Sequence, residues 1–381
     1  MNLRAILLVA LCAAIATCAY FFLAGETTVS TKTLGPSADS SSGASSGKPT
    51  PGNPQPADGA AKNPGDANPP KVNWEVFKSL EGNISTPEAT PADLDRFLAK
   101  HGETAANLVA AFENTGDRRW LDRALELFPN SPIVLMKAIE SLAGGTPRKD
   151  GEAYQANKER LDLIERFKAA DPNNPVPWLF AAQEFFKAKQ TAEGVAEIRA
   201  ALERPAFYTY SNERTDSAQR LYESLGLGSL EASALAMFGL TLTHMSAAQQ
   251  SSRGLMEWQK SSAESGDTVA AEEALRLTYG LGRTFATPEA SRLLIGQLVG
   301  FSMEKRALEA LPADAQRDWL TVAPAQRLAE IERQKQLVKE VTAASDWVLK
   351  SRDEQLFAEW LRRVRTDGEA AALSWVKAQK K

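Results

Sequence analysis

Residues 161–205 decide the fold and read LDLIERFKAADPNNPVPWLFAAQEFFKAKQTAEGVAEIRAALERP. An apolar helix ends at the turn Asp171-Pro172-Asn173-Asn174-Pro175, because proline cannot continue a helix and aspartate and asparagine favour turns. A second helix begins near Trp178, and a third ends near Pro205. The stretch therefore predicts antiparallel helices joined by tight turns, and the neighbouring segments resemble variations on this unit.

Helical periodicity continues from Trp74 to the end of the chain. Apolar residues recur three and four positions apart, and no run alternates apolar and polar residues with the β-branched content of a strand. The chain is therefore predicted to be all-α. The other expected helices begin at Thr90-Pro91 and span Ala105 to Glu113, Arg118 to Phe128, Ile133 to Leu142, Glu152 to Ala170, Glu213 to Leu225, Leu230 to Thr243, Ala247 to Glu264, Val269 to Phe285, Thr287 to Leu311, Pro324 to about Ala344, Asp353 to Val364, and Gly368 onward.

The spacing of the turns indicates a repeat. The turns at Pro129 and Pro172 lie about 43 residues apart, and Pro205 lies about 33 residues beyond the second. Helix pairs that recur every 34 to 47 residues, roughly, are typical of an α-solenoid. Small residues let paired helices approach closely, and large residues fill the gaps between them. Counted from Pro175, the positions of this kind are Trp178, Ala182, Phe185, Gly194, Ile198 and Ala201; the preceding unit has Leu121, Ala124, Pro129, Leu135, Ala138 and Leu142.

This pattern resembles the tetratricopeptide repeat over about Ala105 to Pro205. The resemblance implies a TPR-like α-solenoid of antiparallel helix pairs, followed by additional helices. The chain departs from the pattern at Arg160, where a small residue is expected, and at Ala181, where leucine is usual. Pro205 also comes one residue early. An irregular helical bundle with one repeat-like hairpin is the alternative.

The resemblance also implies a binding surface. In this repeat family the first helix of each pair lines a concave groove that takes a protein or peptide partner. The corresponding residues here are Val176, Leu179, Gln183 and Phe186, with Ile133, Met136 and Glu140 in the weaker unit. The alternative is that neighbouring helices bury these residues, since leucine and phenylalanine are costly to expose.

The N-terminus is predicted to be a signal anchor. Ala5 to Ala24 carries no charge, and about 20 apolar residues in a helix span the hydrocarbon core of a bilayer. Arg4 precedes this segment, so the positive-inside rule places the remainder of the chain outside the cytoplasm. A signal peptide cleaved after Cys18, or lipidation of Cys18, are the alternatives.

Composition then divides the chain into four parts. Residues 26–73 are rich in Ser, Gly, Pro, Ala and Asn without an aromatic residue, so they cannot bury enough apolar surface to fold. We expect a signal anchor or transmembrane helix at 1–25 and a disordered linker at 26–73. TPR-like repeats at 74–210 and a continuous helical region at 211–381 follow.

The last helices are predicted to close the fold. Leu356, Phe357, Trp360, Leu361 and Val364 share one face, which indicates a capping helix; a membrane-surface helix is the alternative. Gly296 and Gly300, four residues apart, indicate close helix packing in a soluble core, because charged residues flank an uncharged run too short to span a bilayer.

Several classes of function are disfavoured by composition. The net charge of −4 lacks the strong basic excess of a nucleic-acid-binding domain. The two cysteines, Cys12 and Cys18, both lie in the N-terminal apolar run, and His101 and His244 are far apart in sequence, so neither a disulfide nor a zinc site is expected in the folded part. No cofactor or catalytic motif is evident.

One short segment favours catalysis weakly. Gly254-Leu255-Met256-Glu257 is similar to a motif of lytic transglycosylases, but Glu231 is followed by Ala232 where those enzymes have serine. We therefore expect no enzyme. The sequence favours a membrane-tethered scaffold that binds a protein or peptide, in the bacterial periplasm. A glycan-acting envelope enzyme and a structural spacer without a ligand are the alternatives.

Overall fold

Helices joined by short turns make up the protein within residues 87–143, 154–204, 206–287 and 292–379, and no strand occurs there. The structure is a computed structural model, and these four ranges are the residues that it describes. The all-α prediction is confirmed for them. The helices are α3 (Pro91–His101), α4 (Ala105–Thr115), α5 (Arg118–Leu127), α6 (Pro132–Ser141), α7 (Lys158–Ala170), α8 (Val176–Lys187), α9 (Thr191–Leu202), α10 (Ser211–Ser224), α11 (Ser229–Phe238), α12 (Thr243–Ser265), α13 (Thr268–Ala286), α14 (Leu294–Glu309), α15 (Pro324–Ser351), α16 (Glu354–Asp367) and α17 (Glu369–Gln379).

Capping residues explain where several helices begin and end. The Thr90 hydroxyl accepts a hydrogen bond from the backbone N–H of Asp93, and the Asp93 carboxylate accepts one from the backbone N–H of Thr90. Asp353 caps α16 in the same way through the N–H of Leu356, at 3.0 Å. Gly116 ends α4 in the left-handed conformation, with φ 68°, which glycine adopts without strain.

Several predicted boundaries are corrected: α11 ends at Phe238 and not at Thr243, and α14 begins at Leu294 and not at Thr287. Helix α7 begins at Lys158, capped by Asn157, and not at Glu152. His244 lies in the first turn of α12, where a break was expected, because burial against other helices outweighs its weak helix propensity. Helix α15 continues to Ser351, since no proline or glycine interrupts it after its first residue.

Three helix pairs, α4–α5, α6–α7 and α8–α9, form a first layer in which each helix packs against the next along the chain. Apolar side chains such as Leu135, Ile164 and Phe180 are fully buried in it. The turn before α8 is fixed by Asn174, whose side-chain amide donates to the Asp171 carboxylate at 2.9 Å and to the Tyr208 carbonyl at 2.7 Å. Asn174, which favours the turn, therefore also joins this turn to the segment that precedes α10.

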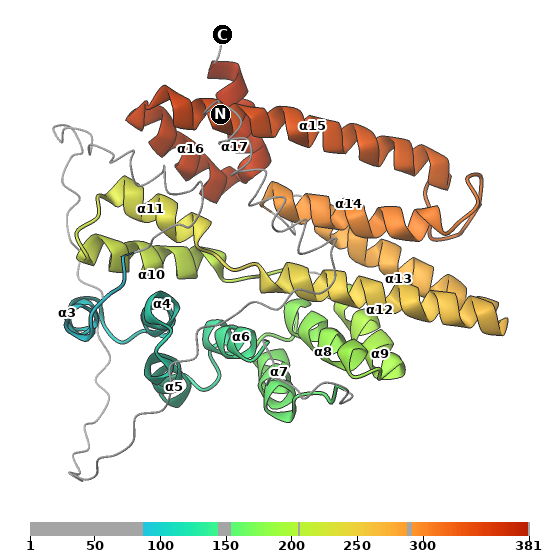
Figure 1. Ribbon diagram of the computed structural model, residues 1–381, viewed down its shortest axis with the longest axis horizontal. Coiled ribbons are helices and arrows are strands. Elements are labelled where there is room, and N and C mark those ends of the chain that lie inside the picture. The colour runs from blue at the N-terminus through green and yellow to red at the C-terminus, as the bar shows by residue number, and fades with distance from the viewer. Residues whose placement is uncertain (1–86, 144–153, 205, 288–291, 380–381) are drawn as a thin grey trace, which may run out of the picture. The chain divides into compact units, whose positions relative to one another are not determined.

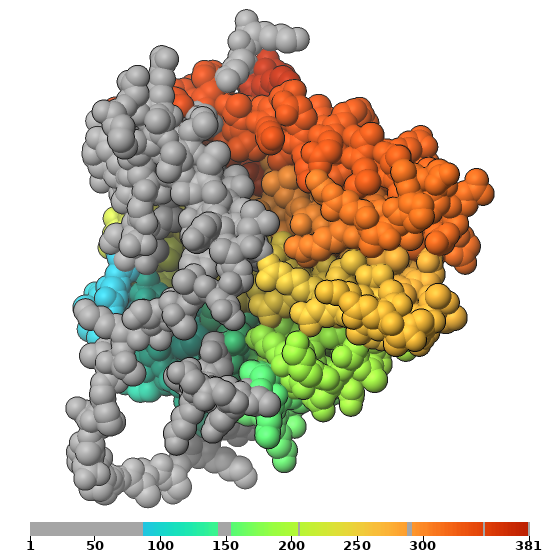
Figure 2. All heavy atoms as spheres, turned by 45° about the vertical axis from the view of Figure 1, so that its right-hand side comes forward, coloured from blue at the N-terminus to red at the C-terminus, as the bar shows by residue number. Residues whose placement is uncertain are grey.

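A second layer covers one side of the first. Helix α10 packs on α4, and α12 packs on α8 and α9. Figure 1 shows α10 and α12 on the side of α4, α6 and α8 that faces away from α5 and α7. Helix α13 packs on both α12 and α14, and Figure 2 shows the colours running in chain order from green through yellow and orange to red across the surface.

Helices α13 and α14 cross in close contact. A Cβ atom built on Gly300 would lie 2.7 Å from the carbonyl oxygen of Gly282 and 2.8 Å from the carbonyl carbon of Phe285. One built on Gly282 would lie 2.6 Å from the amide nitrogen of Glu304. The close packing predicted at Gly300 is therefore confirmed, and its partner on α13 is Gly282.

Helices α15, α16 and α17 enclose a separate apolar cluster. Phe357, Trp360, Leu361 and Val364 of α16 are all buried, as expected of a capping helix. Arg362 and Arg363 lie off this face and pair with Glu359. The apolar face of α16 is thus covered by its own chain, which removes the basis of the membrane-surface alternative.

The start of α14 is capped by a residue from α17. The Glu369 carboxylate accepts a hydrogen bond from the backbone N–H of Leu294 at 2.9 Å. In return, the backbone N–H of Glu369 donates to the Arg292 carbonyl at 2.8 Å. Burial raises the pKa of Glu369, although the Leu294 N–H opposes this shift. The two helix N-termini are therefore joined around one carboxyl group.

We expect Glu369→Gln to stabilise the protein more at pH 7 than at pH 4, because glutamine stays neutral where the buried carboxyl group would ionise. A raised pKa means that the folded state binds a proton more tightly than the unfolded state. Stability from this group is therefore present at low pH and is lost as pH rises through the folded pKa. Glutamine keeps an acceptor for Leu294 but does not ionise. Urea unfolding of both proteins at the two pH values measures the difference.

Glu369→Ala is the matched control, because it removes the acceptor at every pH. Its expected cost is about 1 kcal/mol, as for loss of other helix caps. A Glu369→Gln effect that is equal at both pH values would contradict the shifted pKa.

The N-terminal predictions fall on residues that the structure does not describe. The apolar span at Ala5 to Ala24, the linker at 26–73 and the cysteines are all among them. Within the described ranges, none of the helices combines the length and apolar character needed to cross a bilayer. The described residues all belong to one unit, Pro70–Lys381.

Candidate functional site

The residues predicted to line a partner-binding groove are inside the protein. All seven are buried, from Val176 with none of its surface exposed to Phe186 with 9% exposed. Helix α12 packs on α8, and Arg214 of α10 pairs with Glu140 of α6. These residues therefore do not line an open groove. They are buried within the chain, which is the alternative stated above. The full set is Ile133, Met136, Glu140, Val176, Leu179, Gln183 and Phe186.

Helix α12 occupies the α8 part of this surface. A Cβ built on Gly254 would lie 2.5 Å from the Phe186 ring, and one built on Gly194 would lie 3.0 Å from it. Phe186 is thus enclosed between α9 and α12. One turn away, the Gln183 amide donates to the Gln250 side chain at 2.9 Å. The Phe186 ring fits between α9 and α12 because glycine occupies the facing position on each helix.

Gly254→Ala is expected to destabilise the protein by about 1 to 2 kcal/mol, because the added methyl group overpacks Phe186. The obstacle is a side chain and not backbone, so the cost should be moderate. Combining it with Phe186→Ala, which removes the Cγ and Cδ1 atoms that the new methyl group meets, should cost less than the sum of the two single effects. Chemical denaturation of the four proteins gives the coupling energy, and strict additivity would show that the two residues do not meet.

On α6, Glu140 lies in a cluster of charged side chains. The Arg214 guanidinium of α10 pairs with Glu113 of α4 and with Glu140 of α6, the latter at 3.3 Å. Lys137 also pairs with Glu113, at 2.9 Å. The Thr243 hydroxyl donates to Glu140 at 2.6 Å. Glu140, predicted to contact a partner, instead binds groups of the same chain.

The protonation of this cluster follows from its charges. Burial alone would raise the pKa of Glu113, but Arg214 and Lys137 outweigh it, and the pKa of Glu113 is lowered. Burial likewise disfavours the charged form of Arg214, yet the Glu113 and Glu140 carboxylates hold its pKa above the usual range. Glu113 and Arg214 therefore both favour their charged forms at neutral pH.

Arg160 forms a second buried ion pair. Its guanidinium pairs with Glu184 of α8 and donates to Gln183 at 2.9 Å and to the Ile139 carbonyl at 3.2 Å. The Glu184 carboxylate also accepts from Asn157, at 3.2 Å. Arg160 departs from the repeat pattern because it crosslinks α6, α7 and α8 from the inside. Burial opposes ionisation of Glu184, but its hydrogen bonds and Arg160 lower its pKa overall.

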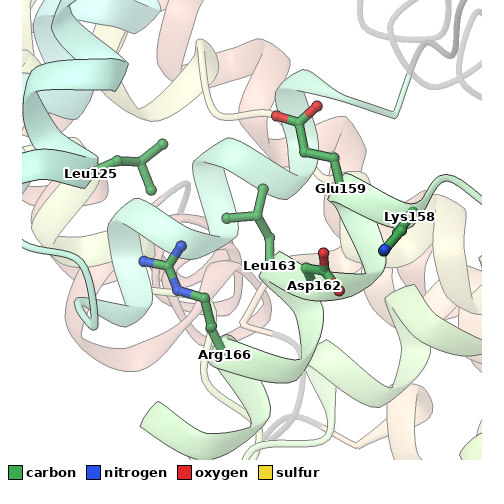
Figure 3. Close-up of a pocket in the computed structure, with 6 residues that line it drawn as sticks. All are labelled: Leu125, Lys158, Glu159, Asp162, Leu163 and Arg166. Atoms are coloured by element: carbon green, nitrogen blue, oxygen red, sulfur yellow. The ribbon is translucent and has the colours of Figure 1, made fainter.

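An open pocket lies on the other side of the first layer, between α5 and α7. Its volume is about 410 Å³. Figure 3 shows Leu125 of α5 facing Leu163 and Arg166 of α7, with the remaining residues at the other end of the pocket. Arg166 also donates to the Pro129 carbonyl. The lining residues are Leu125, Lys158, Glu159, Asp162, Leu163 and Arg166.

None of these pocket residues was predicted from sequence. They come from two helices about 35 residues apart, and only the pairing of α5 with α7 brings them together. The alternation of leucine with charged residues on α7 is visible in the sequence, but it is also the pattern of any amphipathic helix. The pocket carries both signs of charge around a small apolar floor, which suits contact with a polypeptide side chain.

The residues considered as catalytic or metal-binding candidates are buried or paired within the protein. Glu257 is exposed and pairs with Lys189 at 3.1 Å, whereas Glu231 is buried in α11. His244 is buried and stacks on Phe285; burial, with Arg214 nearby, lowers its pKa to about 3. Over the described part of the chain, no three His, Cys, Asp or Glu side chains are grouped to hold a metal ion.

Comparison with known proteins returns no relative. Neither a protein-family model, nor a curated protein, nor a solved structure matches this chain.

Proposed function

We propose that this chain is a membrane-tethered scaffold outside the cytoplasm, built as a TPR-like α-solenoid, that binds a protein or peptide partner in bacterial envelope organisation. The apolar span at Ala5 to Ala24 and the Ser/Gly/Pro-rich linker after it support the tether. The three successive helix pairs of the first layer support the repeat-like scaffold.

The observation that carries the proposal is an open pocket on the outer side of a first layer that is crosslinked internally. The layer itself is crosslinked by the buried ion pair of Arg160 with Glu184, which joins α6, α7 and α8. Its outer side carries the open pocket between α5 and α7. A braced layer presents that pocket with little conformational freedom, and such preorganisation favours binding.

The chemistry of the pocket indicates the partner segment. Leu125 and Leu163 offer room for one apolar side chain, and Glu159 and Asp162 offer carboxylates beside it. Both carboxylates are on exposed residues. We infer a peptide segment that carries an apolar residue flanked by charged residues, with a lysine or arginine beside Glu159 and Asp162 and an acidic residue beside Lys158.

Site-specific photocrosslinking tests this surface in the native membrane. A photoreactive residue replacing Leu125 should crosslink to a discrete partner, and the same residue replacing Val269, which is 78% exposed elsewhere, should not. Combining Glu159→Lys with Asp162→Lys should reduce the crosslinked product at least about tenfold, because like charges then oppose a basic segment. Glu193→Lys on α9 is the control for a charge reversal off the site.

Two outcomes of this experiment reject the proposal. One is equal crosslinking from positions 125 and 269. The other is a product that the double charge reversal leaves unchanged.

The tether is tested separately. Reporter fusions at Lys71 should be active in the periplasm and inactive in the cytoplasm, as expected if Arg4 stays on the cytoplasmic side. Cytoplasmic reporter activity at Lys71 contradicts the proposed location and leaves the pocket assignment to its own test.

A further inference from the structure

The contact between α10 and α4 is unusually polar for a buried interface. Arg214, Ser217 and Arg220 recur every three residues along α10, and the first two are buried. Arg220 donates to the Asn107 side chain of α4 at 3.2 Å, and Arg214 pairs with Glu113 of the same helix. Charged groups lose hydration when buried, so such pairs contribute little net stability compared with apolar packing.

The contact between α12 and α8 has the opposite character. Phe186 fits against Gly254, and Leu255 of α12 is fully buried. Met245 and Ala248 of α12 belong to the same apolar cluster as Leu179 of α8. Apolar, close-packed contact of this kind resists separation, whereas polar interfaces between packed bodies allow relative motion. The second layer is therefore held firmly at α12 and weakly at α10.

The connections on either side of the α10–α11 hairpin are non-helical. Residues 206–210 precede α10, and Tyr210 has a left-handed backbone with φ 54°, which costs free energy for a residue other than glycine. Residues 239–242 separate α11 from α12. Both places can absorb a change of backbone angles. On its other side the hairpin contacts α16, through Phe238 against Trp360.

We propose that the α10–α11 hairpin is a strap, latched to α4 and α6 by Arg214, which opens on that side while α12 stays seated on α8. Opening uncovers Asn107, Glu113, Lys137 and Glu140 and leaves the hairpin attached to α16. The two carboxylates released from Arg214 then form a site for an arginine or lysine of a helical partner segment. Only this last consequence rests on the proposed function; the opening itself does not.

Thiol labelling of the full-length protein tests the strap. Cys12 and Cys18 are the only cysteines of the chain, so Cys12→Ser with Cys18→Ser gives a thiol-free background. Ala110→Cys reports on the strap, since Ala110 is 2% exposed and lies three residues from both Asn107 and Glu113. Ala247→Cys reports on whether α12 stays packed on α8, since Ala247 is fully buried three residues before Gln250.

Under native conditions the Ala110→Cys thiol should be labelled at least about tenfold faster than the Ala247→Cys thiol, because a local opening requires less free energy than global unfolding. Arg220→Met should accelerate labelling at position 110 by about fivefold or more and leave position 247 unchanged. Arg220→Met is used because it weakens the latch without leaving buried carboxylates unpaired, as loss of Arg214 would.

Arg327→Met is the matched control. Arg327 pairs with the buried Glu304 at 2.8 Å and joins α14 to α15, helices that are not part of the strap. Arg327→Met should not accelerate thiol labelling at position 110 more than at position 247. Equal labelling rates at positions 110 and 247, or an Arg220→Met effect that is equal at both, overturn the strap. Neither result depends on partner capture, so the proposed function is tested independently.

Discussion

Gly300→Ala is expected to lower the free energy of unfolding by about 3 kcal/mol, at the upper end of the usual cost of overpacking. The added methyl group meets backbone atoms of α13, including the Gly282 carbonyl oxygen at 2.7 Å. Backbone cannot rotate away as a side chain can, so the two helices must separate along their length. Gly282→Ala should have a similar effect from the other side, since its Cβ meets the Glu304 amide nitrogen at 2.6 Å.

Gly280→Ala supplies the control on the same helix. A Cβ at Gly280 meets a terminal methyl carbon of Leu202 at 3.3 Å, which a small side-chain movement relieves. Alanine also has a higher helix propensity than glycine, by about 1 kcal/mol. Gly280→Ala should therefore be neutral or slightly stabilising. Urea denaturation of all three variants measures the contrast, and equal effects at positions 280 and 300 would mean that the helix crossing is looser than described.

Arg160→Met is expected to cost about 3 to 5 kcal/mol, because it leaves the Glu184 carboxylate charged and without its arginine in the interior. The side chains of Arg160 and Glu184 are each only 1% exposed, so water cannot replace the lost partner. The Ile139 carbonyl and Gln183 also lose a donor. Thermal and chemical unfolding at pH 7 should both show the loss.

Adding Glu184→Gln to Arg160→Met should restore a large part of that stability. Glutamine has no charge to bury, and its side-chain oxygen still accepts from Tyr154 and Asn157. Replacing both members of a buried pair is often close to neutral, whereas removing one is not. A double variant as unstable as Arg160→Met alone would show that Arg160 acts through packing and its backbone hydrogen bond, and not through charge.

Much of the helical layout could be predicted from the sequence, because its signals are local. Thr90, Gly116 and Asp353 mark helix ends by their own side chains or lack of one. The apolar stripe of α16 likewise predicts the buried face that is observed. Each of these predictions needs only residues within one or two helical turns.

The covering of α8 by α12 could not be predicted in the same way. The buried residues of α12 include Gln249, Ser251 and Ser252, so the helix has no strong apolar face to mark it as interior. Its fit depends on Gly254 meeting Phe186, two residues 68 positions apart. The repeat resemblance places Leu179 and Phe186 on one face, but it carries no information about which other helices of the chain lie there.

Arg214 and Glu113 form an ion pair although they lie 101 residues apart in the chain. During synthesis, α4 is therefore complete well before the helix that covers it. When α4, α6 and α8 have been made, the helices that cover their inner side do not yet exist. At translation speeds of roughly 5 to 20 residues per second, Leu179 and Phe186 await α12 for several seconds. A nascent chain of this protein therefore presents an apolar face that the finished molecule hides, and export before folding would spare it that interval.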